Sequence, residues 1–365
     1  MPRLVAIVLP AGAAFARALA EAWADGDAVV PIDPRLPSAA ARRLLEAMRP
    51  AVLVDGSGEG RPLPDPVDTE PGDALVVATS GTTGEPRGAV LTHDAVRASA
   101  DAVGARLAVD PDQDAWLAIL PVAHIGGLSV VTRALVTGTP LLFDDHDDRA
   151  TLVSVVPTQA NRLDLDRFRV VLVGAGADDR ERPANVIHTY GMTETGSGVA
   201  YDGVPLDGVE FRVGPHDGEI HVRGPMLLRA YRDGADPRDP NGWFPTGDAG
   251  HLDAEGRIHV AGRLAEVVVT GGEKVWPTPV EEAIRSHPGV ADVAVAGRPD
   301  PDWGQRVVAW VVPRDPSTPP TLESLRDHVK ATLPAYAAPR EVVITAALPR
   351  TDLGKIRRKF LTDGR

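Results

Sequence analysis

Apolar and polar residues alternate along the first half of the chain in blocks that favour an α/β fold. Helical segments separate short apolar runs, which suit buried strands and lie at residues 28–32, 51–54, 116–120, 154–156 and 170–173. One helix is expected over residues 37–48, with Ser38 as its N-cap. Strands that alternate with helices assemble into largely parallel sheets, so this half predicts a large α/β domain.

The pattern of apolar and polar residues changes after residue 208. Short alternating segments, such as residues 218–224, indicate antiparallel strands and turns. Beyond Gly262 the sequence predicts helix, strand, strand and helix in that order, near residues 279–285, 290–296, 306–312 and 322–333. This mixture predicts a small α+β domain of about a hundred residues.

Two interpretations compete at the N-terminus. Arg3 and the apolar residues 4–10 have the look of a signal peptide. A short strand followed by an Ala-rich helix accounts for the same residues, and Arg17 would interrupt the apolar part of a signal. We therefore expect a strand and a helix.

Composition narrows the class of protein. The chain has 365 residues, of which 43% are hydrophobic, so it can bury a sizeable core. It has no cysteine, which excludes disulfides, a thiolate nucleophile and a cysteine-based metal site. Its net charge is -13 and it has no long basic run, which argues against nucleic acid as a partner. No apolar stretch is long enough to span a bilayer.

Lysine is rare in this chain. Of 38 basic residues only four are lysines, at positions 274, 330, 355 and 359. Because the chain tends to use arginine as its basic residue, each lysine raises the question of why arginine was not used there.

A loop rich in glycine and hydroxyl groups follows the apolar run at residues 73–78. It reads Thr79-Ser80-Gly81-Thr82-Thr83-Gly84-Glu85-Pro86-Arg87-Gly88. Its glycines let backbone N–H groups approach an anion, and Arg87 adds a fixed positive charge. The loop lacks the Gly-Lys-Ser/Thr triplet of a Walker A motif. A plain hairpin turn remains the alternative.

Two acidic residues stand in further polar segments. Glu194 lies in His188-Thr189-Tyr190-Gly191-Met192-Thr193-Glu194-Thr195, and its carboxylate is a hard ligand suited to Mg²⁺. The alternative is a polar loop with an N-capping threonine. Asp248 ends Gly242-Trp243-Phe244-Pro245-Thr246-Gly247-Asp248 and can accept several hydrogen bonds, unless it is a simple turn residue.

These segments resemble, in order, the motifs of the adenylate-forming enzymes, which include acyl- and aryl-CoA synthetases, luciferases and the adenylation domains of peptide synthetases. The resemblance continues through Gly262-Arg263, Thr270-Gly271-Gly272 and Leu353-Gly354-Lys355, so it covers most of the chain. It implies an α/β fold with a large N-terminal domain of packed β-sheets and helices and a small mobile α+β C-terminal domain. The domains would span residues 1–263 and 264–365. The first would be somewhat trimmed relative to the family, in which the phosphate loop usually begins later than Thr79 does here.

The resemblance also assigns the nucleotide-binding residues. Thr193 would donate to the α-phosphate, Tyr190 would flank the adenine, Asp248 would hold the ribose hydroxyls and Glu194 would bind Mg²⁺. Arg87 stands where the family usually has lysine. The implied ATP-binding set is Thr79, Ser80, Gly81, Thr82, Thr83, Gly84, Arg87, Gly176, Tyr190, Gly191, Asp248 and Arg263.

The remaining motifs match the catalytic and mobile parts of the family. Lys355 matches the lysine that neutralises charge while the substrate carboxylate joins the α-phosphate. Gly271 and Gly272 match the loop that lines the channel for the thiol arm of coenzyme A. Ala265 stands at the hinge, where the family usually has aspartate or lysine.

The acyl substrate is indicated by residues 121–133. His124 matches the residue that borders the acyl pocket and gates the thiol, with Gly174 and Ala175 as a further wall. Arg133 sits in an apolar stretch, where an unpaired guanidinium would be costly. It needs a protein carboxylate or a second carboxylate on the substrate. The spacing of His124 and Arg133, with residues 154–159, resembles the o-succinylbenzoate–CoA ligases of menaquinone biosynthesis.

The resemblance implies a cytoplasmic, AMP-forming acid–thiol ligase that uses ATP, Mg²⁺ and CoA as co-substrate. Its partners would be small molecules, with no nucleic acid and no membrane, and it would form a homodimer if it assembles. Three alternatives remain: a CoA ligase for another aryl or short-chain acid, a loader of carrier proteins, and a non-catalytic nucleotide- or acyl-binding relative. The last would be expected to lack Lys355, Glu194 or Asp248, and all three are present.

Overall fold

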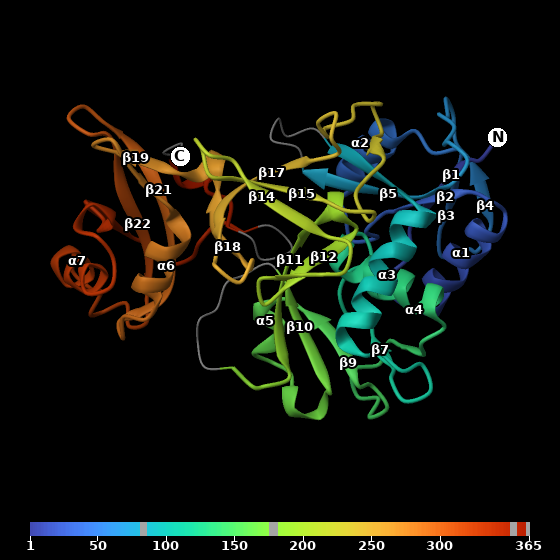
Figure 1. Cartoon of the computed structure of the whole chain (residues 1–365), viewed down its shortest axis with the longest axis horizontal. Helices are drawn as coiled ribbons and strands as arrows, with labels where there is room; N and C mark the ends of the chain where they lie inside the picture. The colour runs from blue at the N-terminus through green and yellow to red at the C-terminus, as the bar shows by residue number, and fades with distance from the viewer. Residues whose placement is uncertain (81–85, 175–181, 351–355, 363–365) are drawn as a thin grey trace. The chain divides into compact units, whose positions relative to one another are not determined.

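The computed structural model describes residues 1–80, 86–174, 182–350 and 356–362 (Figure 1). The chain divides into two compact units. The first comprises Met1–Phe211, Val222–Phe244 and Ala254–Ile258, and the second comprises Arg212–His221, Pro245–Asp253 and His259–Arg365. These units differ in extent from the predicted domains, since the second unit takes in segments before residue 263. The predicted boundary concerns where the small domain moves, and it stays a prediction.

The first sheet of unit one has seven strands in the order β16-β6-β5-β2-β1-β3-β4. They are β1 (Leu4–Ile7), β2 (Ala28–Pro31), β3 (Val52–Val54), β4 (Gly60–Pro62), β5 (Asp73–Ser80), β6 (Pro86–Thr92) and β16 (Ala230–Tyr231). Strands β3, β1, β2 and β5 run parallel, while β4, β6 and β16 pair antiparallel with their neighbours. The last strand, β16, comes from far along the chain.

The second sheet also has seven strands, in the order β13-β12-β11-β10-β9-β7-β8. They are β7 (Trp116–Leu117), β8 (Leu141–Leu142), β9 (Leu152–Val155), β10 (Val170–Gly174), β11 (Val186–Met192), β12 (Ser197–Tyr201) and β13 (Val204–Pro205). Strands β8, β7, β9, β10 and β11 are parallel. The predicted α/β class is confirmed.

Helices α1 (Ala13–Ala24), α3 (His93–Leu107) and α4 (Ile125–Thr137) share one core with both sheets (Figure 1). The alternation within β1 explains this layering. Val5 and Ile7 face that core, while Leu4 and Ala6 face a separate cluster with Met48 of α2 (Ser38–Met48). A strand buried on both faces is apolar throughout, as the sequence pattern requires. Short helix α5 (Pro157–Ala160) follows β9.

The four-stranded sheet β14-β15-β17-β18 comprises β14 (Glu210–Val213), β15 (Glu219–Arg223), β17 (Phe244–Leu252) and β18 (Ile258–Arg263). The second unit adds a five-stranded sheet of β19 (Val268–Thr270), β20 (Glu273–Val275), β21 (Val290–Asp300), β22 (Gly304–Pro313) and β23 (Glu341–Ile344). Helices α6 (Pro277–Arg285), α7 (Leu322–Lys330) and α8 (Lys359–Thr362) complete it. Its core is separate and includes Ile284, Val293 and Leu325.

Two local predictions were wrong. Ser38 is the first helical residue rather than the N-cap, because Pro37 holds the extended conformation before the helix and no side chain caps it. The strand expected over residues 116–120 ends at Leu117. Beyond it, the carbonyls of Leu120 and Pro121 lie so close to Gly127 that a Cβ there would be 2.5 Å from each oxygen. The chain after β7 thus packs against the first turn of α4, and position 127 has to be glycine.

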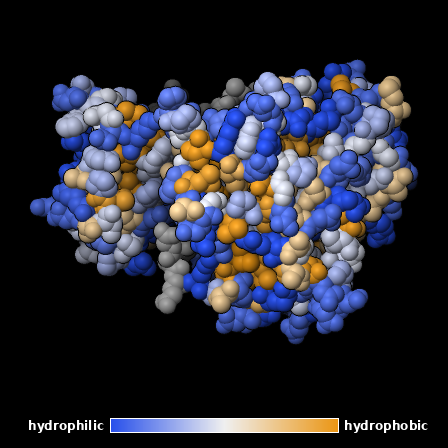
Figure 2. Space-filling view, in the orientation of Figure 1, coloured by the Kyte–Doolittle hydropathy of each residue, from blue (hydrophilic) through white to orange (hydrophobic). Residues whose placement is uncertain are grey.

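Hydrophilic residues cover much of the face seen in Figure 2, with apolar residues interspersed among them. Within the described ranges, no helix combines the length and the apolar character that crossing a membrane requires. The predicted strand and helix at the N-terminus are confirmed as β1 and α1.

Candidate active site

A single 3₁₀ turn, η2 (Thr193–Thr195), organises the candidate site in the first unit. It connects β11 to β12 and packs against β5 and β6, the two strands that flank the predicted phosphate loop. The Leu228 N–H donates to the Glu194 carbonyl oxygen at 2.8 Å and fixes the turn. The predicted metal ligand Glu194 therefore lies beside the predicted phosphate-binding hairpin.

Glu194 is oriented by Tyr231, which the sequence did not indicate. The Tyr231 hydroxyl donates to Glu194 Oε1 at 3.0 Å. The Arg87 guanidinium lies 3.8 Å from the centre of the Tyr231 ring and 3.0 Å from an oxygen of Asp233. Burial, and then the charge of Glu194, raise the pKa of Tyr231, so it remains a protonated donor. No local sequence signal connects Tyr231 to Glu194, because β16 reaches the site only through the fold.

Glu194 fits a magnesium ion that carries phosphates. Mg²⁺ is commonly held by one or two carboxylates together with substrate phosphates and water. In the part of the chain that the structure describes, no group of three or more His, Asp or Glu side chains could hold a metal by itself. Tyr231 occupies one acceptor position of the carboxylate, which has further lone pairs for a cation. The residues therefore suit a metal whose coordination the nucleotide completes.

The segment before η2 explains why position 191 must be glycine. The pairing of β11 with β12 shifts register between Tyr190 and Gly191, and a Cβ at 191 would lie 2.2 Å from the Ser197 carbonyl oxygen. The turn itself is closed by Thr195, whose hydroxyl accepts from the Met192 N–H at 2.9 Å. Tyr190 packs near Phe211, with ring centroids 6.2 Å apart. The nucleotide-binding roles of Tyr190, Gly191 and Thr193 stay predictions.

The phosphate loop joins two antiparallel neighbours, as a hairpin does. Thr79 pairs with Arg87, and the Thr79 hydroxyl donates to the Arg87 carbonyl oxygen at 3.3 Å. Gly174 ends β10 opposite Thr189 of β11. Several predicted residues lie outside the described ranges, namely Gly81, Thr82, Thr83, Gly84, Ala175, Gly176 and Lys355, as does the side chain of Ser80.

Arg133 is buried in the first unit, with a relative exposure of 3%. Its Nη2 donates to the Ser197 hydroxyl at 3.1 Å, and its guanidinium lies 4.7 Å from the centre of the Trp116 ring. Its Nε and Nη1 have no hydrogen-bond partner among the described residues. Burial lowers the pKa of Arg133. A partner carboxylate within the protein, one of the two predicted possibilities, is thus not found in the described ranges.

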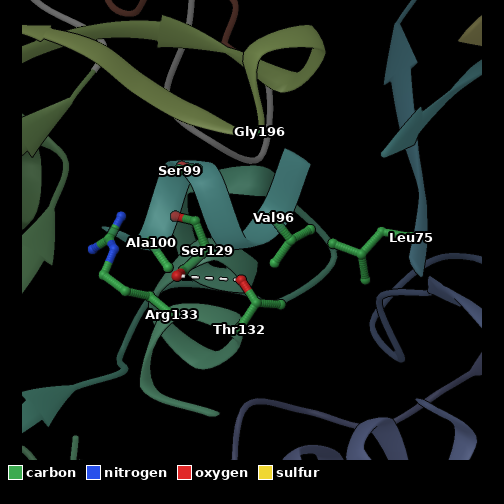
Figure 3. Close-up of a pocket in the computed structure, with 8 residues that line it drawn as sticks. All are labelled: Leu75, Val96, Ser99, Ala100, Ser129, Thr132, Arg133 and Gly196. Atoms are coloured by element: carbon green, nitrogen blue, oxygen red, sulfur yellow. Dashed lines mark hydrogen bonds between the residues drawn. The ribbon is translucent and has the colours of Figure 1, made fainter. Parts of the chain in front are cut away.

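A small cavity of about 10 Å³ adjoins Arg133 between α3 and α4 (Figure 3). Ser99 and Ala100 of α3 line it with Ser129 and Thr132 of α4. This volume accommodates about one water molecule. The cavity is too small for a whole substrate.

His124 and Arg133 are presented by the same helix. His124 is the N-cap of α4 in an extended conformation, and its N–H donates to the Pro121 carbonyl oxygen at 3.2 Å. Nine residues of helix separate the two positions by about 13 Å along the axis. They would therefore bind different ends of a ligand rather than one carboxylate.

In the second unit, two predicted nucleotide-binding residues meet directly. Arg263 Nε lies 3.0 Å from Asp248 Oδ1, and Arg263 Nη1 donates to the Thr246 carbonyl oxygen at 2.9 Å. The Thr246 hydroxyl accepts from the Asp248 N–H at 3.1 Å. A carboxylate has several acceptor positions, so Asp248 can hold Arg263 and still accept from ribose hydroxyls.

The hinge and channel predictions fall on two turns of the same unit. Ala265 is the middle residue of η3 (Leu264–Glu266), a short turn that begins directly after Arg263. Gly271 and Gly272 form the turn between β19 and β20 with φ of 60° and 88°. A Cβ at 271 would lie 2.6 Å from the Trp303 ring, whereas a Cβ at 272 meets open space. The fold itself thus requires glycine at 271, and a thiol arm is not needed to explain it.

Comparison with known proteins gives a consistent result. The model of the AMP-binding enzyme family matches residues 55–232, and the model of the AMP-binding enzyme C-terminal domain matches residues 279–355. A probable 2-succinylbenzoate–CoA ligase of Mycobacterium tuberculosis is 40% identical over 323 residues, which is 79% of this chain and 83% of the relative. A 2-succinylbenzoate–CoA ligase of Listeria monocytogenes is 32% identical over 332 residues, covering 80% and 70%.

Two solved structures of o-succinylbenzoate CoA synthetase (MenE) from Bacillus subtilis are similar over nearly the whole chain. The complex with the acyl-adenylate intermediate OSB-AMP has a TM-score of 0.85 at 27% identity, covering 100% of this chain and 88% of that one. The complex with ATP and a magnesium ion has a TM-score of 0.83 at 27% identity, covering 98% and 88%.

Proposed function

The chain belongs to the family of AMP-binding enzymes, and we propose that it is an ATP-dependent ligase that joins o-succinylbenzoate to coenzyme A. The carboxylate attacks the α-phosphate of ATP to give acyl-AMP and pyrophosphate, and the thiol of CoA then displaces AMP. The product, o-succinylbenzoyl-CoA, belongs to menaquinone biosynthesis. The names of the relatives and the OSB-AMP complex of the similar structure support this acid.

Arg133 is the observation in this chain that carries the choice of acid. o-Succinylbenzoate has two carboxylates, of which the succinyl one is activated and the aromatic one needs a partner. Arg133 offers a buried guanidinium with Nε and Nη1 unpartnered among the described residues. A guanidinium can hold a carboxylate through two parallel hydrogen bonds. An acid with one carboxylate would leave this cation buried and unmatched, which is costly.

The other residues take roles in positioning and in charge stabilisation. Glu194, oriented by Tyr231, would hold Mg²⁺, which when bound neutralises phosphate charge. Asp248 and Arg263 would bind the ribose, and Thr193 and Arg87 the phosphates. Lys355 would act in acyl-AMP formation, and His124 would border the acyl group at the other end of α4 from Arg133. The thiol arm would pass the turn at Gly272 after rotation about the hinge at Ala265.

We expect the partners to be the acid, ATP and CoA, with no role for nucleic acid or a membrane, and we place the reaction in the cytoplasm, where ATP is supplied. A homodimer stays a prediction.

Pyrophosphate release tests the proposed function. The enzyme is supplied with MgATP, CoA and, in separate reactions, o-succinylbenzoate, benzoate, 4-coumarate, acetate or octanoate. Strong turnover with o-succinylbenzoate alone supports the proposal. Pyrophosphate release with another acid only would support the ligase reaction but reject the role in menaquinone biosynthesis. No pyrophosphate release with any of these acids would reject the ligase activity.

Lys355→Ala separates the two half-reactions. The rate of acyl-AMP formation from MgATP and the acid should fall strongly, while the rate of thioester formation from supplied acyl-AMP should stay unchanged. The reason is that the lysine acts only while the α-phosphate is attacked. Equal loss of both half-reactions would contradict its assigned role.

A further inference from the structure

The side chain of Arg87 is held from two directions by residues of one short turn. Its guanidinium lies 3.8 Å from the centre of the Tyr231 ring, and its Nη2 donates to the two carboxylate oxygens of Asp233 at 3.0 and 3.4 Å. Within the described ranges, the hydrogen bonds of this guanidinium all come from Nη2. The side chain is 37% exposed, so its other nitrogens are accessible to a ligand.

The turn that carries Tyr231 and Asp233 is itself well fixed. Asp233 Oδ1 accepts from the Ala235 N–H at 3.0 Å, and the Tyr231 N–H donates to the Ala235 carbonyl oxygen at 2.8 Å. Tyr231 also pairs with Ala89 of β6. The carboxylate of Asp233 therefore has a set position relative to β6, the strand that contains Arg87.

Tyr231 connects this pair to the predicted metal ligand. Arg87 lies over the face of the Tyr231 ring, while the hydroxyl of the same ring donates to Glu194 Oε1 at 3.0 Å. A cation suited to phosphate and a carboxylate suited to Mg²⁺ are thus held by two parts of one side chain. Hydrogen bonds from the Ala235 N–H and then from Arg87 lower the pKa of Asp233, so its carboxylate is ionised at neutral pH.

We propose that Asp233 is a positioning residue for nucleotide binding: by holding Nη2 of Arg87 it keeps the guanidinium on the Tyr231 ring, with its remaining donors presented to the phosphates of MgATP. This inference rests on the proposed function, because it takes Arg87 and Glu194 to bind MgATP. An arginine side chain has several rotatable bonds. Ordering it in advance therefore reduces the entropy that is lost when a phosphate binds.

Asp233→Asn tests the proposal through the sign of its effect. Asparagine keeps an oxygen for the Ala235 N–H, so the turn is preserved while the charge is removed. The Kd for MgATP, measured by titration calorimetry, should rise by about three- to fivefold, the scale of a partly exposed ion pair. A carboxylate that only competed with phosphate for Arg87 would have the opposite effect, because its removal would lower the Kd. An unchanged or lower Kd overturns the inference.

A double-mutant cycle shows whether Asp233 acts through Arg87. Arg87→Gln should raise the Kd for MgATP by itself, and adding Asp233→Asn to it should cause no further rise, because the residue to be positioned is gone. A further rise of the same size in the double variant would also overturn the inference. The melting temperature without ligand should stay near that of the wild type, since the ion pair is partly exposed.

Asp236→Asn is the matched control. It removes the same charge three positions further along the chain, where the carboxylate pairs with Arg238 at 2.8 Å, and its Kd for MgATP should equal that of the wild type.

Pyrophosphate release by the wild type with o-succinylbenzoate is measured alongside. If this release is found and Asp233→Asn does not raise the Kd for MgATP, the positioning role fails and the proposed function stands. If the wild type binds MgATP and Asp233→Asn weakens that binding, but no acid supports pyrophosphate release, the positioning role stands and the ligase activity fails. A wild type that binds no MgATP rejects both.

Discussion

The guanidinium of Arg133 lies in the interior of the first unit, with a hydroxyl and an indole ring as its neighbours. A buried cation without a carboxylate destabilises the folded protein, because desolvation is not offset by an opposite charge. Such a residue can persist where a ligand supplies the missing charge. The sequence pointed to this position from its apolar surroundings, and in the structure Arg133 is buried with no carboxylate partner among the described residues.

Arg133→Met tests this trade-off between stability and activity. Replacing the cation with an apolar side chain of similar length should raise the free energy of unfolding by about 1–3 kcal/mol. The kcat/KM for o-succinylbenzoate should fall on the order of a hundredfold, since the second carboxylate loses its partner. Urea unfolding and steady-state kinetics measure the two effects. Arg97→Met on α3, at an exposed position, is the control and should change neither. Lower stability with unchanged kinetics would assign Arg133 a structural role.

Tyr231→Phe removes only the hydroxyl that orients Glu194. The carboxylate should then hold Mg²⁺ less well, and the apparent KM for MgATP should rise by about tenfold, the effect of one hydrogen bond to a charged group. Titrating Mg²⁺ at fixed ATP measures this. The rise should shrink at saturating Mg²⁺, and a rise independent of Mg²⁺ would contradict the assigned contact.

At the scale of elements, the beginnings of three parallel strands are tied by one carboxylate. Asp114 precedes β7, Thr151 precedes β9 and Arg169 precedes β10. Asp114 accepts from Arg169 Nε and Nη2 at 2.9 and 2.6 Å and from the Thr151 hydroxyl at 2.7 Å. The predicted site residues Gly174 and Glu194 lie toward the opposite ends of the strands, since Gly174 is the last residue of β10 and Glu194 follows β11. The Asp114 interactions thus lie at the end of the sheet away from these predicted site residues.

Asp114→Asn should lower the free energy of unfolding at pH 7 by about 1–3 kcal/mol, because it weakens a buried charged acceptor. Burial alone would raise the pKa of Asp114, but the hydrogen bonds from Arg169, the Asp110 N–H and Thr151 hold it below its ordinary value. The stabilisation is present above the unfolded pKa of about 3.9 and is lost as the pH falls through the folded pKa.

Urea unfolding of wild type and Asp114→Asn across this pH range checks the sign. The difference in stability should be largest near neutral pH and should shrink as the pH falls below about 4. A difference that does not depend on pH would mean that the ionised form of Asp114 is not what stabilises these strands.

How far the sequence predicts an element depends on the range of the forces that shape it. The buried strands and α6 follow local patterns and lie close to their expected positions. Strand β7 was predicted too long: it ends at Leu117, and the carbonyls of Leu120 and Pro121 beyond it lie against Gly127 of α4, a contact between separate segments that a local pattern does not show. Site motifs that are continuous in sequence were found, whereas Tyr231 was not, since it contacts Glu194 only after folding.

At the scale of the whole molecule, ligand binding should be visible as added stability. A ligand at a hundred times its Kd stabilises the folded state by about 2.7 kcal/mol. MgATP should therefore raise the melting temperature of the wild type. EDTA should abolish most of this increase, and Glu194→Gln should behave as the wild type does with EDTA. Thermal unfolding with and without ligand measures it, and an undiminished increase in Glu194→Gln would remove Glu194 from the metal site.

The first sheet is completed by a strand, β16, that comes much later in the sequence than the others. Strand β6 receives its last neighbour only when β16 returns to it, and the Arg87 to Asp233 contact beside them spans 146 residues. While the protein is being synthesised, the outer edge of β6 therefore stays open until Tyr231 has left the ribosome. An open edge is a site where strands of other chains can add, so this interval is the time at which a nascent chain most needs protection by chaperones. Because β16 also carries Tyr231, closing that edge and orienting Glu194 are one event, and a chain that misfolds there loses its nucleotide chemistry as well.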